Sequence, residues 1–177
     1  EASKAFYDSV FHFPKPTIAM IQGYCIGGGM GLAVACDIRL CEDKSRFAIP
    51  AAKLGLGYGY EGIRRLANLV GPAMVKEIFF TARQFSAGEA QEMGLVNRVL
   101  PPHMLAPYVD DYAKRISENA PMTMESVKAI VQAIQDDESA RDLDALDAMV
   151  KACFASQDYI EGRRAFMEKR KPNFTGS

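Results

Sequence analysis

Hydrophobic positions along the first hundred residues fall into short runs separated by glycine, proline and charged residues. Apolar runs of four or five residues bounded in this way are typical of buried strands, whereas longer runs with a 3.6-residue period indicate helices. The pattern predicts an opening amphipathic helix that ends near Phe13. It then predicts strands over 17–21, 38–41, 46–49 and 95–100, and helices over 29–36, 61–69, 72–81 and 86–93.

From residue 104 the pattern is helical as far as residue 171, with breaks near Pro121, Asp136 and Ser156. Strands and helices therefore alternate only in the first part of the chain. This predicts an α/β core over residues 1–103 and a helical region over residues 104–177. Four short strands make a thin sheet for so apolar a chain, so we expect further strands upstream.

The composition of the chain indicates which kinds of molecule it can bind. Among 177 residues, 49% are hydrophobic, and 21 basic residues against 22 acidic ones give a net charge of -1. The chain is long enough to bury a sizeable core. A balanced charge argues against nucleic acid or an anionic membrane as the main partner, and no apolar run reaches membrane-spanning length. We therefore expect a small-molecule partner.

The four cysteines, Cys25, Cys36, Cys41 and Cys153, lie in apolar segments and show no CxxC spacing. This arrangement favours buried thiols over a zinc site or a disulfide framework. It is typical of a reducing, cytoplasmic compartment, and we expect no metal ion.

Three consecutive glycines, Gly27, Gly28 and Gly29, join a predicted strand to a predicted helix. Without Cβ atoms the backbone can be approached closely, and the first N–H groups of a helix have no partner within it. Together with the helix dipole, these N–H groups favour a negative oxygen, either the oxyanion of an ester or thioester or a phosphate. A tight turn that only allows close packing is the other interpretation.

Two nucleotide-binding motifs fail at this turn. A Walker-type loop needs Lys followed by Ser or Thr after its last glycine, but the glycines are followed by Met30 and Gly31. In the dinucleotide fingerprint GxGxxG, the third glycine position is occupied by Leu32. The glycine turn is therefore not predicted to bind a nucleotide by either motif.

Three segments together resemble the crotonase, or enoyl-CoA hydratase/isomerase, superfamily. They are KPTIAMIQGYCIGGGMGLAVACDIRLCEDKSRFAIPAAKLGL, TARQFSAGEAQEMGLVNRVLP and GRRAFMEKRKPNF, and they follow the family's order. The resemblance implies a spiral of ββα turns, of which the N-terminal ones are missing here, and a helical C-terminal trimerisation region. It also implies an acyl-CoA substrate, no cofactor beyond that coenzyme A, and a homotrimer or a dimer of trimers.

The resemblance also implies individual site residues. Gly28 matches the family's second oxyanion-hole donor through its backbone N–H, and the first donor would lie upstream. Phe166 and Lys169 match positions of the C-terminal helix that approach coenzyme A, although Lys169 would equally suit a solvated helix end. Positions that line the acyl and pantetheine path are matched by Tyr24, Ile26, Gly27, Pro50 and Leu54.

The chain departs from the hydratases of this family at two positions. Those enzymes place one glutamate two residues after the glycine triplet and another just after the proline of the next short strand. This chain has Gly31 and Ala51 there. Because hydration needs an acid and a base, ordinary hydratase and isomerase chemistry is not expected.

Around LGYGYEGI and DYIEGRRAFMEKRKPNF the chain is similar to the methylmalonyl-CoA decarboxylase branch, which has a tyrosine at the position of Tyr58. Decarboxylation forms an enolate without a base, and Tyr58 would then orient the leaving carboxylate, unless its role is packing. The alternatives are a hydratase or isomerase with a non-standard acid or base such as Glu61, and a non-catalytic subunit that binds coenzyme A. Glu61 would also suit the first turn of a helix, where it complements the dipole.

Overall fold

The computed structural model describes residues 2–177, with side chains from residue 5 onward. The chain packs as two compact units. The first contains the residues up to Phe13 together with 17–111, and the second contains residues 14–16 together with 112–177.

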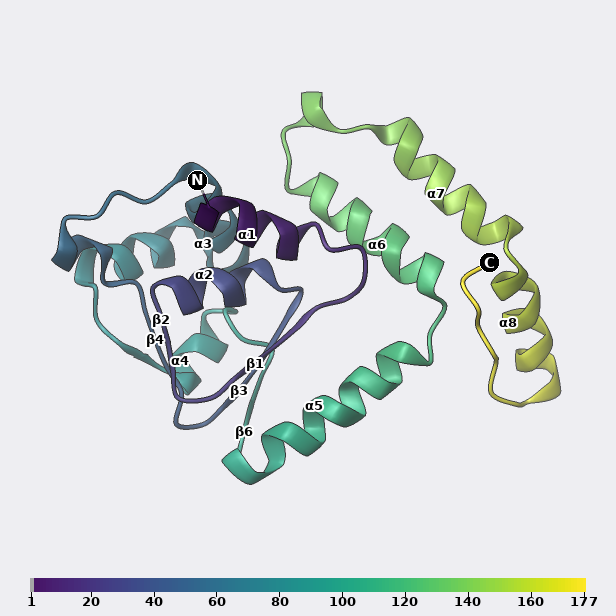
Figure 1. Cartoon of the computed structure of the whole chain (residues 1–177), viewed down its shortest axis with the longest axis horizontal. Helices are drawn as coiled ribbons and strands as arrows, with labels where there is room; N and C mark the ends of the chain where they lie inside the picture. The colour runs from purple at the N-terminus through teal and green to yellow at the C-terminus, as the bar shows by residue number, and fades with distance from the viewer. Residues whose placement is uncertain (1) are drawn as a thin grey trace. The chain divides into compact units, whose positions relative to one another are not determined.

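The first unit is built from a repeat in which two strands that belong to different sheets are followed by a helix (Figure 1). One sheet is parallel throughout and holds β1 (Ile18–Ile21), β3 (Ile38–Glu42) and β6 (Arg98–Leu100). The other pairs β2 (Tyr24–Ile26) in parallel with β4 (Arg46–Ala48), and β4 in antiparallel with β5 (Phe85–Ser86). This arrangement confirms the α/β class.

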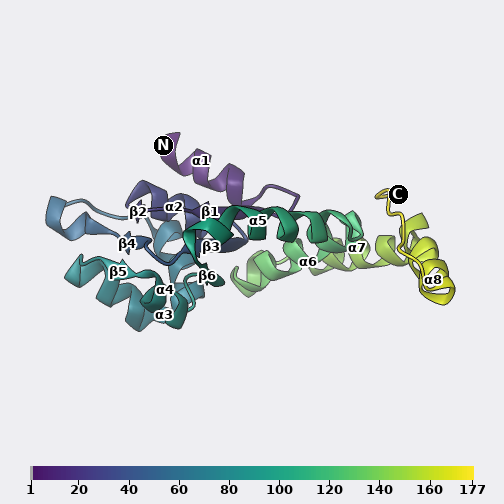
Figure 2. The ribbon, with the colours of Figure 1, turned by 90° about the horizontal axis from the view of Figure 1, so that it is seen from below.

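The helices of the first unit surround these two sheets. They are α1 (Ala2–Phe11), α2 (Gly28–Ala35), the 3₁₀ helix η1 (Pro50–Leu54), α3 (Tyr60–Thr81) and α4 (Ala87–Glu92). Helix α1 packs against α2 (Figure 2). Gly71 has φ 78° and ψ 160°, which interrupts α3 just before Pro72. This break confirms the prediction of two helical segments there.

Two strand predictions need correction. The strand that leads into the glycines is present as β2, but β5 was not predicted, because a strand of two residues carries too short a pattern to detect and exists through pairing with β4. The predicted strand over 95–100 is regular only from Arg98. The N–H groups of Leu95 and Val96 instead donate to the carbonyl of Ala90, at 2.8 and 3.2 Å, and close the end of α4.

The turn between α2 and β3 is fixed by a side chain. The Asp37 carboxylate accepts hydrogen bonds from the backbone N–H and the hydroxyl of Thr17, at 2.7 and 2.9 Å. Beside it Arg39, only 4% exposed, donates from its guanidinium to the carbonyl of Leu95 at 2.7 Å. Asp37 therefore braces this turn. The bond ties the start of β1 to the end of α2, and so helps to place the glycine turn.

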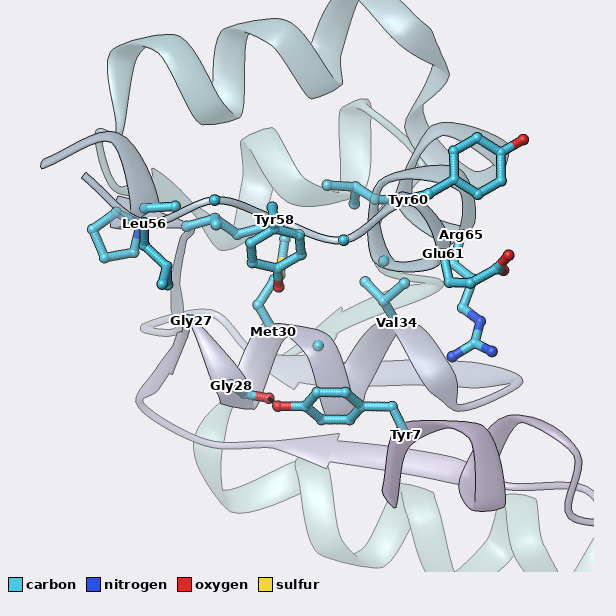
Figure 3. A pocket seen from close by; sticks show the side chains of 18 of the residues that line it. Tyr7, Gly27, Gly28, Met30, Val34, Leu56, Tyr58, Tyr60, Glu61 and Arg65 are labelled. Carbon is cyan, nitrogen blue, oxygen red and sulfur yellow. Dashed lines mark hydrogen bonds between the residues drawn. The ribbon is translucent and has the colours of Figure 1, made fainter. Parts of the chain in front are cut away.

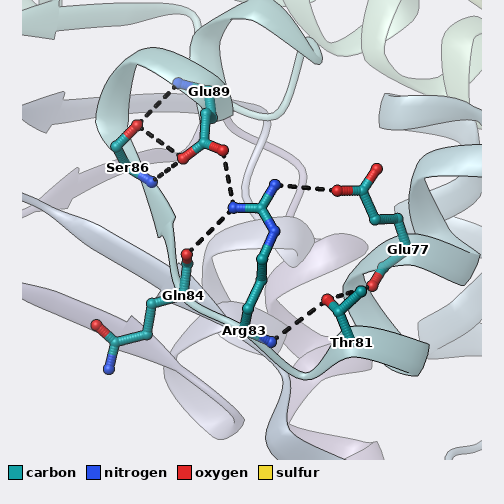
Figure 4. Close-up of polar contacts among 6 residues, drawn as sticks. All are labelled: Glu77, Thr81, Arg83, Gln84, Ser86 and Glu89. Atoms are coloured by element: carbon teal, nitrogen blue, oxygen red, sulfur yellow. Dashed lines mark hydrogen bonds and ion pairs between the residues drawn. The ribbon is translucent and has the colours of Figure 1, made fainter.

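A capping box begins α4 (Figure 4). The Ser86 hydroxyl accepts from the N–H of Glu89 at 3.2 Å, and the Glu89 carboxylate accepts from the N–H of Ser86 at 2.8 Å. Arg83 adds an ion pair to Glu89 at 2.8 Å and another to Glu77 at 3.0 Å. The hydrogen bond from Ser86 and the contact with Arg83 lower the pKa of Glu89 to about 2. This network joins the end of α3 to the start of α4.

The second unit is helical. It contains α6 (Pro121–Ile134), the short η2 (Glu138–Ala140), α7 (Leu143–Ala155) and α8 (Gln157–Glu168), and α5 (Pro102–Ser117) leads into it. The predicted breaks near Pro121, Asp136 and Ser156 are therefore confirmed. Helices α6 and α7 pack in opposite directions (Figure 1). The C-terminal tail folds back onto α8, where the buried Asp158 accepts from the N–H groups of Thr175 and Gly176 at 2.7 and 2.9 Å.

Residues 2–177 contain no helix that is both long enough and apolar enough to cross a bilayer. None of the four cysteines forms a disulfide, and Cys25 and Cys41 are buried as predicted. Cys36 and Cys153 are only partly buried, which corrects the prediction for those two thiols. Burial raises the pKa of the Cys25 thiol to about 11, so this thiol stays protonated and packs as a small apolar side chain.

Candidate active site

A cavity of about 610 Å³ lies in the first unit, between the glycine turn that begins α2, the loop of residues 55–59 that precedes α3, and helix α1 (Figure 3). Its walls are largely apolar, with side chains such as Met30, Val34, Ile49 and Leu66. Hydroxyl, carboxylate and guanidinium groups reach it from α1 and from the start of α3. A concave apolar site with a few convergent polar groups is the usual form of a small-molecule site.

The glycine turn presents an unpaired backbone donor to this cavity. Gly27 is the N-cap of α2 with φ 57°, a left-handed conformation that favours glycine. Its N–H donates to the carbonyl of Ala48 at 3.0 Å, and its carbonyl accepts from Gly31 N–H at 3.0 Å. Within the described part of the chain, the N–H of Gly28 makes no hydrogen bond. As the first residue of α2, Gly28 therefore offers its N–H, together with the helix dipole, to a negative oxygen.

Tyr58 comes from the loop before α3 and is half-buried in the cavity wall. Its ring meets Phe79 edge to face, with 4.9 Å between ring centroids. A Cβ at Gly62 would lie only 2.8 Å from the Tyr58 ring, so the glycine in the first turn of α3 allows this ring position. Burial, and to a lesser extent Tyr7, raises the pKa of Tyr58. Its hydroxyl is therefore a protonated hydrogen-bond donor across the neutral pH range.

Tyr7 on α1 also lines the cavity, although no motif in the sequence indicates it. Its hydroxyl donates to the carbonyl of Gly28 at 3.2 Å. Its ring lies over Gly31, where a Cβ would approach the ring carbon Cζ to 3.1 Å. The signal in the sequence was Gly31 itself, because a glycine inside a helix is unfavourable and often marks a close approach. That signal does not say which residue approaches.

Of the predicted site residues, Gly27, Gly28, Pro50, Leu54 and Tyr58 line the cavity together. Tyr24 and Ile26 are not among the lining residues, and the Tyr24 side chain is 74% exposed. Phe166 and Lys169 belong to the second unit, on and just after α8. There Phe166 lines an apolar cavity of about 730 Å³ between α6, α7 and α8.

The two positions at which the resemblance places glutamates, Gly31 and Ala51, both line the cavity. Among the described residues the carboxylates that reach its walls are Asp8 and Glu61, and each has a cationic partner. Asp8 pairs with the buried Arg65 at 2.6 Å, and Glu61 pairs with Arg64 at 2.7 Å. The Arg65 guanidinium also lies over the Phe11 ring, 4.2 Å from its centroid. Both carboxylates are thus held by ion pairs. Glu61 also occupies the first turn of α3, where it complements the helix dipole.

Comparison with known proteins gives one consistent match. A family model described as enoyl-CoA hydratase/isomerase matches residues 1–177. The chain is 41% identical over 162 residues to the crotonyl-CoA hydratase of Syntrophomonas wolfei, which covers 90% of this chain and 62% of that protein. It is 36% identical over 171 residues to the carnitinyl-CoA dehydratase of Salmonella arizonae, which covers 94% of this chain and 66% of that protein.

Solved structures agree with this match. An enoyl-CoA hydratase/carnithine racemase from Magnetospirillum magneticum superposes with a TM-score of 0.89 at 34% identity, over 98% of this chain and 64% of that one. An enoyl-CoA hydratase from Bacillus anthracis superposes with a TM-score of 0.88 at 34% identity, over 99% of this chain and 68% of that one. The chain thus spans just under two thirds of the length of the two curated relatives named above.

Proposed function

Because this chain belongs to the enoyl-CoA hydratase/isomerase family and has the crotonase fold, we propose that its cavity binds an acyl-CoA thioester. The observation that carries the proposal is the unpaired N–H of Gly28, the first residue of α2, which lines a largely apolar cavity of about 610 Å³. An enolate formed from the thioester places its negative oxygen at this N–H. A preorganised donor aimed at developing charge is often the largest single contribution to catalysis.

The reaction that best fits the residues of this cavity is decarboxylation. The bond between the α-carbon and a carboxylate breaks, carbon dioxide leaves, and the electron pair of the bond becomes the enolate. The enolate then takes one proton at the α-carbon. No base is needed for the first step, which suits a cavity with Gly31 and Ala51 where a hydratase would carry carboxylates. Apolar walls favour the loss of a charged carboxylate, and Tyr58 offers it a protonated hydroxyl for orientation.

Hydration with a non-standard acid and base is the second candidate. Two observations support it: relatives are named crotonyl-CoA hydratase and short-chain-enoyl-CoA hydratase, and Glu61 reaches the cavity. Its carboxylate is held in place by the ion pair with Arg64 at 2.7 Å.

A steady-state assay of the full-length protein with methylmalonyl-CoA and crotonyl-CoA, side by side, separates these candidates. We expect release of carbon dioxide from methylmalonyl-CoA and no loss of the crotonyl-CoA enoyl absorbance. Loss of that absorbance alone would contradict decarboxylation and favour hydration. Tight binding of coenzyme A with no turnover of either thioester would contradict both reactions and indicate a binding subunit.

For assembly, we propose a homotrimer or a dimer of trimers formed through the C-terminal helices. Apolar side chains on α7 and α8 remain exposed in the second unit, including Phe154 at 63%, Phe166 at 83% and Met167 at 80%. Exposed apolar surface of this kind is typical of an interface between subunits. Sedimentation equilibrium of the full-length protein should give three or six times the mass of one chain. A monomer at micromolar concentration would contradict the proposal.

A further inference from the structure

Tyr7 makes two contacts with α2 that concern different parts of its side chain. The hydroxyl donates to the carbonyl of Gly28, 3.2 Å away. The phenol end of the ring lies over Gly31, where a Cβ would approach Cζ to 3.1 Å and both Cε atoms to 3.4 Å. Contacts of 3.1 Å are closer than carbon atoms normally pack. A side chain at position 31 would therefore force the Tyr7 ring to move by a few tenths of an ångström.

The position of this ring bears on which reaction the cavity permits. Gly31 lies one turn after the oxyanion donor Gly28 on the same helix, so the space above it borders the proposed enolate. Hydration would require a water molecule held there by a polar side chain, since a new bond must form between that water's oxygen and the β-carbon. An aromatic ring fills that space and provides no base. Tyr58 approaches from the opposite wall, and Tyr7 is one of the causes of its raised pKa (Figure 3).

We propose that Tyr7 is a specificity-determining residue of this cavity. Its ring excludes water and any polar side chain from the space over Gly31, and its hydroxyl fixes the carbonyl of Gly28 and thereby the glycine turn. This proposal rests on the proposed function in one respect, which is the position of the enolate. It does not depend on which reaction the protein naturally catalyses. A merely structural Tyr7 would hold α1 on α2 without influencing which reaction occurs.

The claim that the Tyr7 ring occupies the space over Gly31 can be tested without an activity assay. The test is a double-mutant cycle in which thermal unfolding of the full-length protein is measured. Alanine is favoured over glycine inside a helix, so Gly31→Ala should raise the melting temperature by about 2 °C where space is available. We expect that rise in a Tyr7→Ala background. With Tyr7 present, the rise should vanish or reverse, because the new methyl group meets the ring. Equal shifts in the two backgrounds would overturn the claim that the ring occupies this space.

The claim that the ring prevents hydration can be tested by introducing a base at position 31. The double variant Gly31→Glu with Ala51→Glu supplies two carboxylates, and we expect little crotonyl-CoA hydration from it while Tyr7 is present. Adding Tyr7→Ala should raise hydration at least about 10-fold, in line with the 10²- to 10⁴-fold contribution of a positioned acid or base. Adding Tyr7→Phe instead should leave hydration low, since Phe keeps the ring and loses only the hydroxyl.

Equal hydration rates in the Tyr7→Ala and Tyr7→Phe backgrounds would overturn the proposal. So would full hydration by the double variant with Tyr7 intact. Phe6→Ala serves as the control, because Phe6 is an aromatic residue on the same helix that does not line the cavity, and it should not raise hydration. These outcomes do not depend on what the unmodified protein turns over, so failure here is distinguishable from failure of the decarboxylation proposal.

Discussion

Gly28→Pro is expected to lower acyl-CoA turnover by about 100- to 1000-fold, which is the usual effect of removing one oxyanion-hole donor. Proline has no N–H, so the substitution deletes the donor that faces the cavity. Gly28 is the first residue of α2, and proline is well tolerated at the first position of a helix. The helix should therefore persist, and the loss should appear in kcat with the full-length protein and its preferred thioester.

Gly28→Ala is the matched control, because alanine keeps the N–H and adds the same Cβ. That Cβ would lie 3.2 Å from the Tyr7 hydroxyl oxygen, so the Ala variant measures the cost of moving Tyr7 slightly. The ratio of the Ala rate to the Pro rate then isolates the N–H. If the Pro variant retains the rate of the Ala variant while both bind coenzyme A, Gly28 is not an oxyanion donor.

Tyr58→Phe is expected to lower kcat by about 10- to 100-fold with little change in the affinity for coenzyme A. A hydrogen bond to a charged group is worth roughly 1.5–3 kcal/mol, and the proposed partner is the carboxylate that leaves the substrate. Phenylalanine keeps the edge-to-face contact with Phe79, so the loop should retain its position. Because the raised pKa keeps the hydroxyl protonated, the ratio of wild-type to variant rates should stay constant below about pH 9.

Tyr60→Phe provides the comparison, two residues after Tyr58 at the first position of α3. The Tyr60 side chain is 73% exposed, and its hydroxyl points away from Gly28 and Tyr58 (Figure 3). A change of less than about threefold is expected, because a hydroxyl in water contributes little. Similar losses for the two tyrosines, or unchanged turnover in Tyr58→Phe, would remove Tyr58 from the mechanism and leave it a packing residue.

Local chemistry made several features of this fold predictable. The Ser86 to Glu89 capping box, the break in α3 before Pro72 and the division of the C-terminal helices near Pro121 and Ser156 depend on interactions within a few residues. The shortest strand, β5, escaped prediction, because it has two residues and exists through pairing with β4, a partner distant in sequence. Expectations for Tyr24 and Ile26 rested on resemblance alone, and the cavity does not include them.

The sequence by itself determined the alternation of strands and helices, the turn of three glycines before a helix, and the lack of carboxylates at positions 31 and 51. Each of these is a property of residue type and short-range backbone geometry. Only the tertiary structure decided what faces that turn. It brought Tyr7, 21 residues before Gly28, onto the glycine turn and over Gly31. It also placed Tyr58 over Gly62 and gave both cavity carboxylates a cationic partner. These contacts join separate elements, and their positions follow from how α1, α2 and α3 pack around one core rather than from any local pattern.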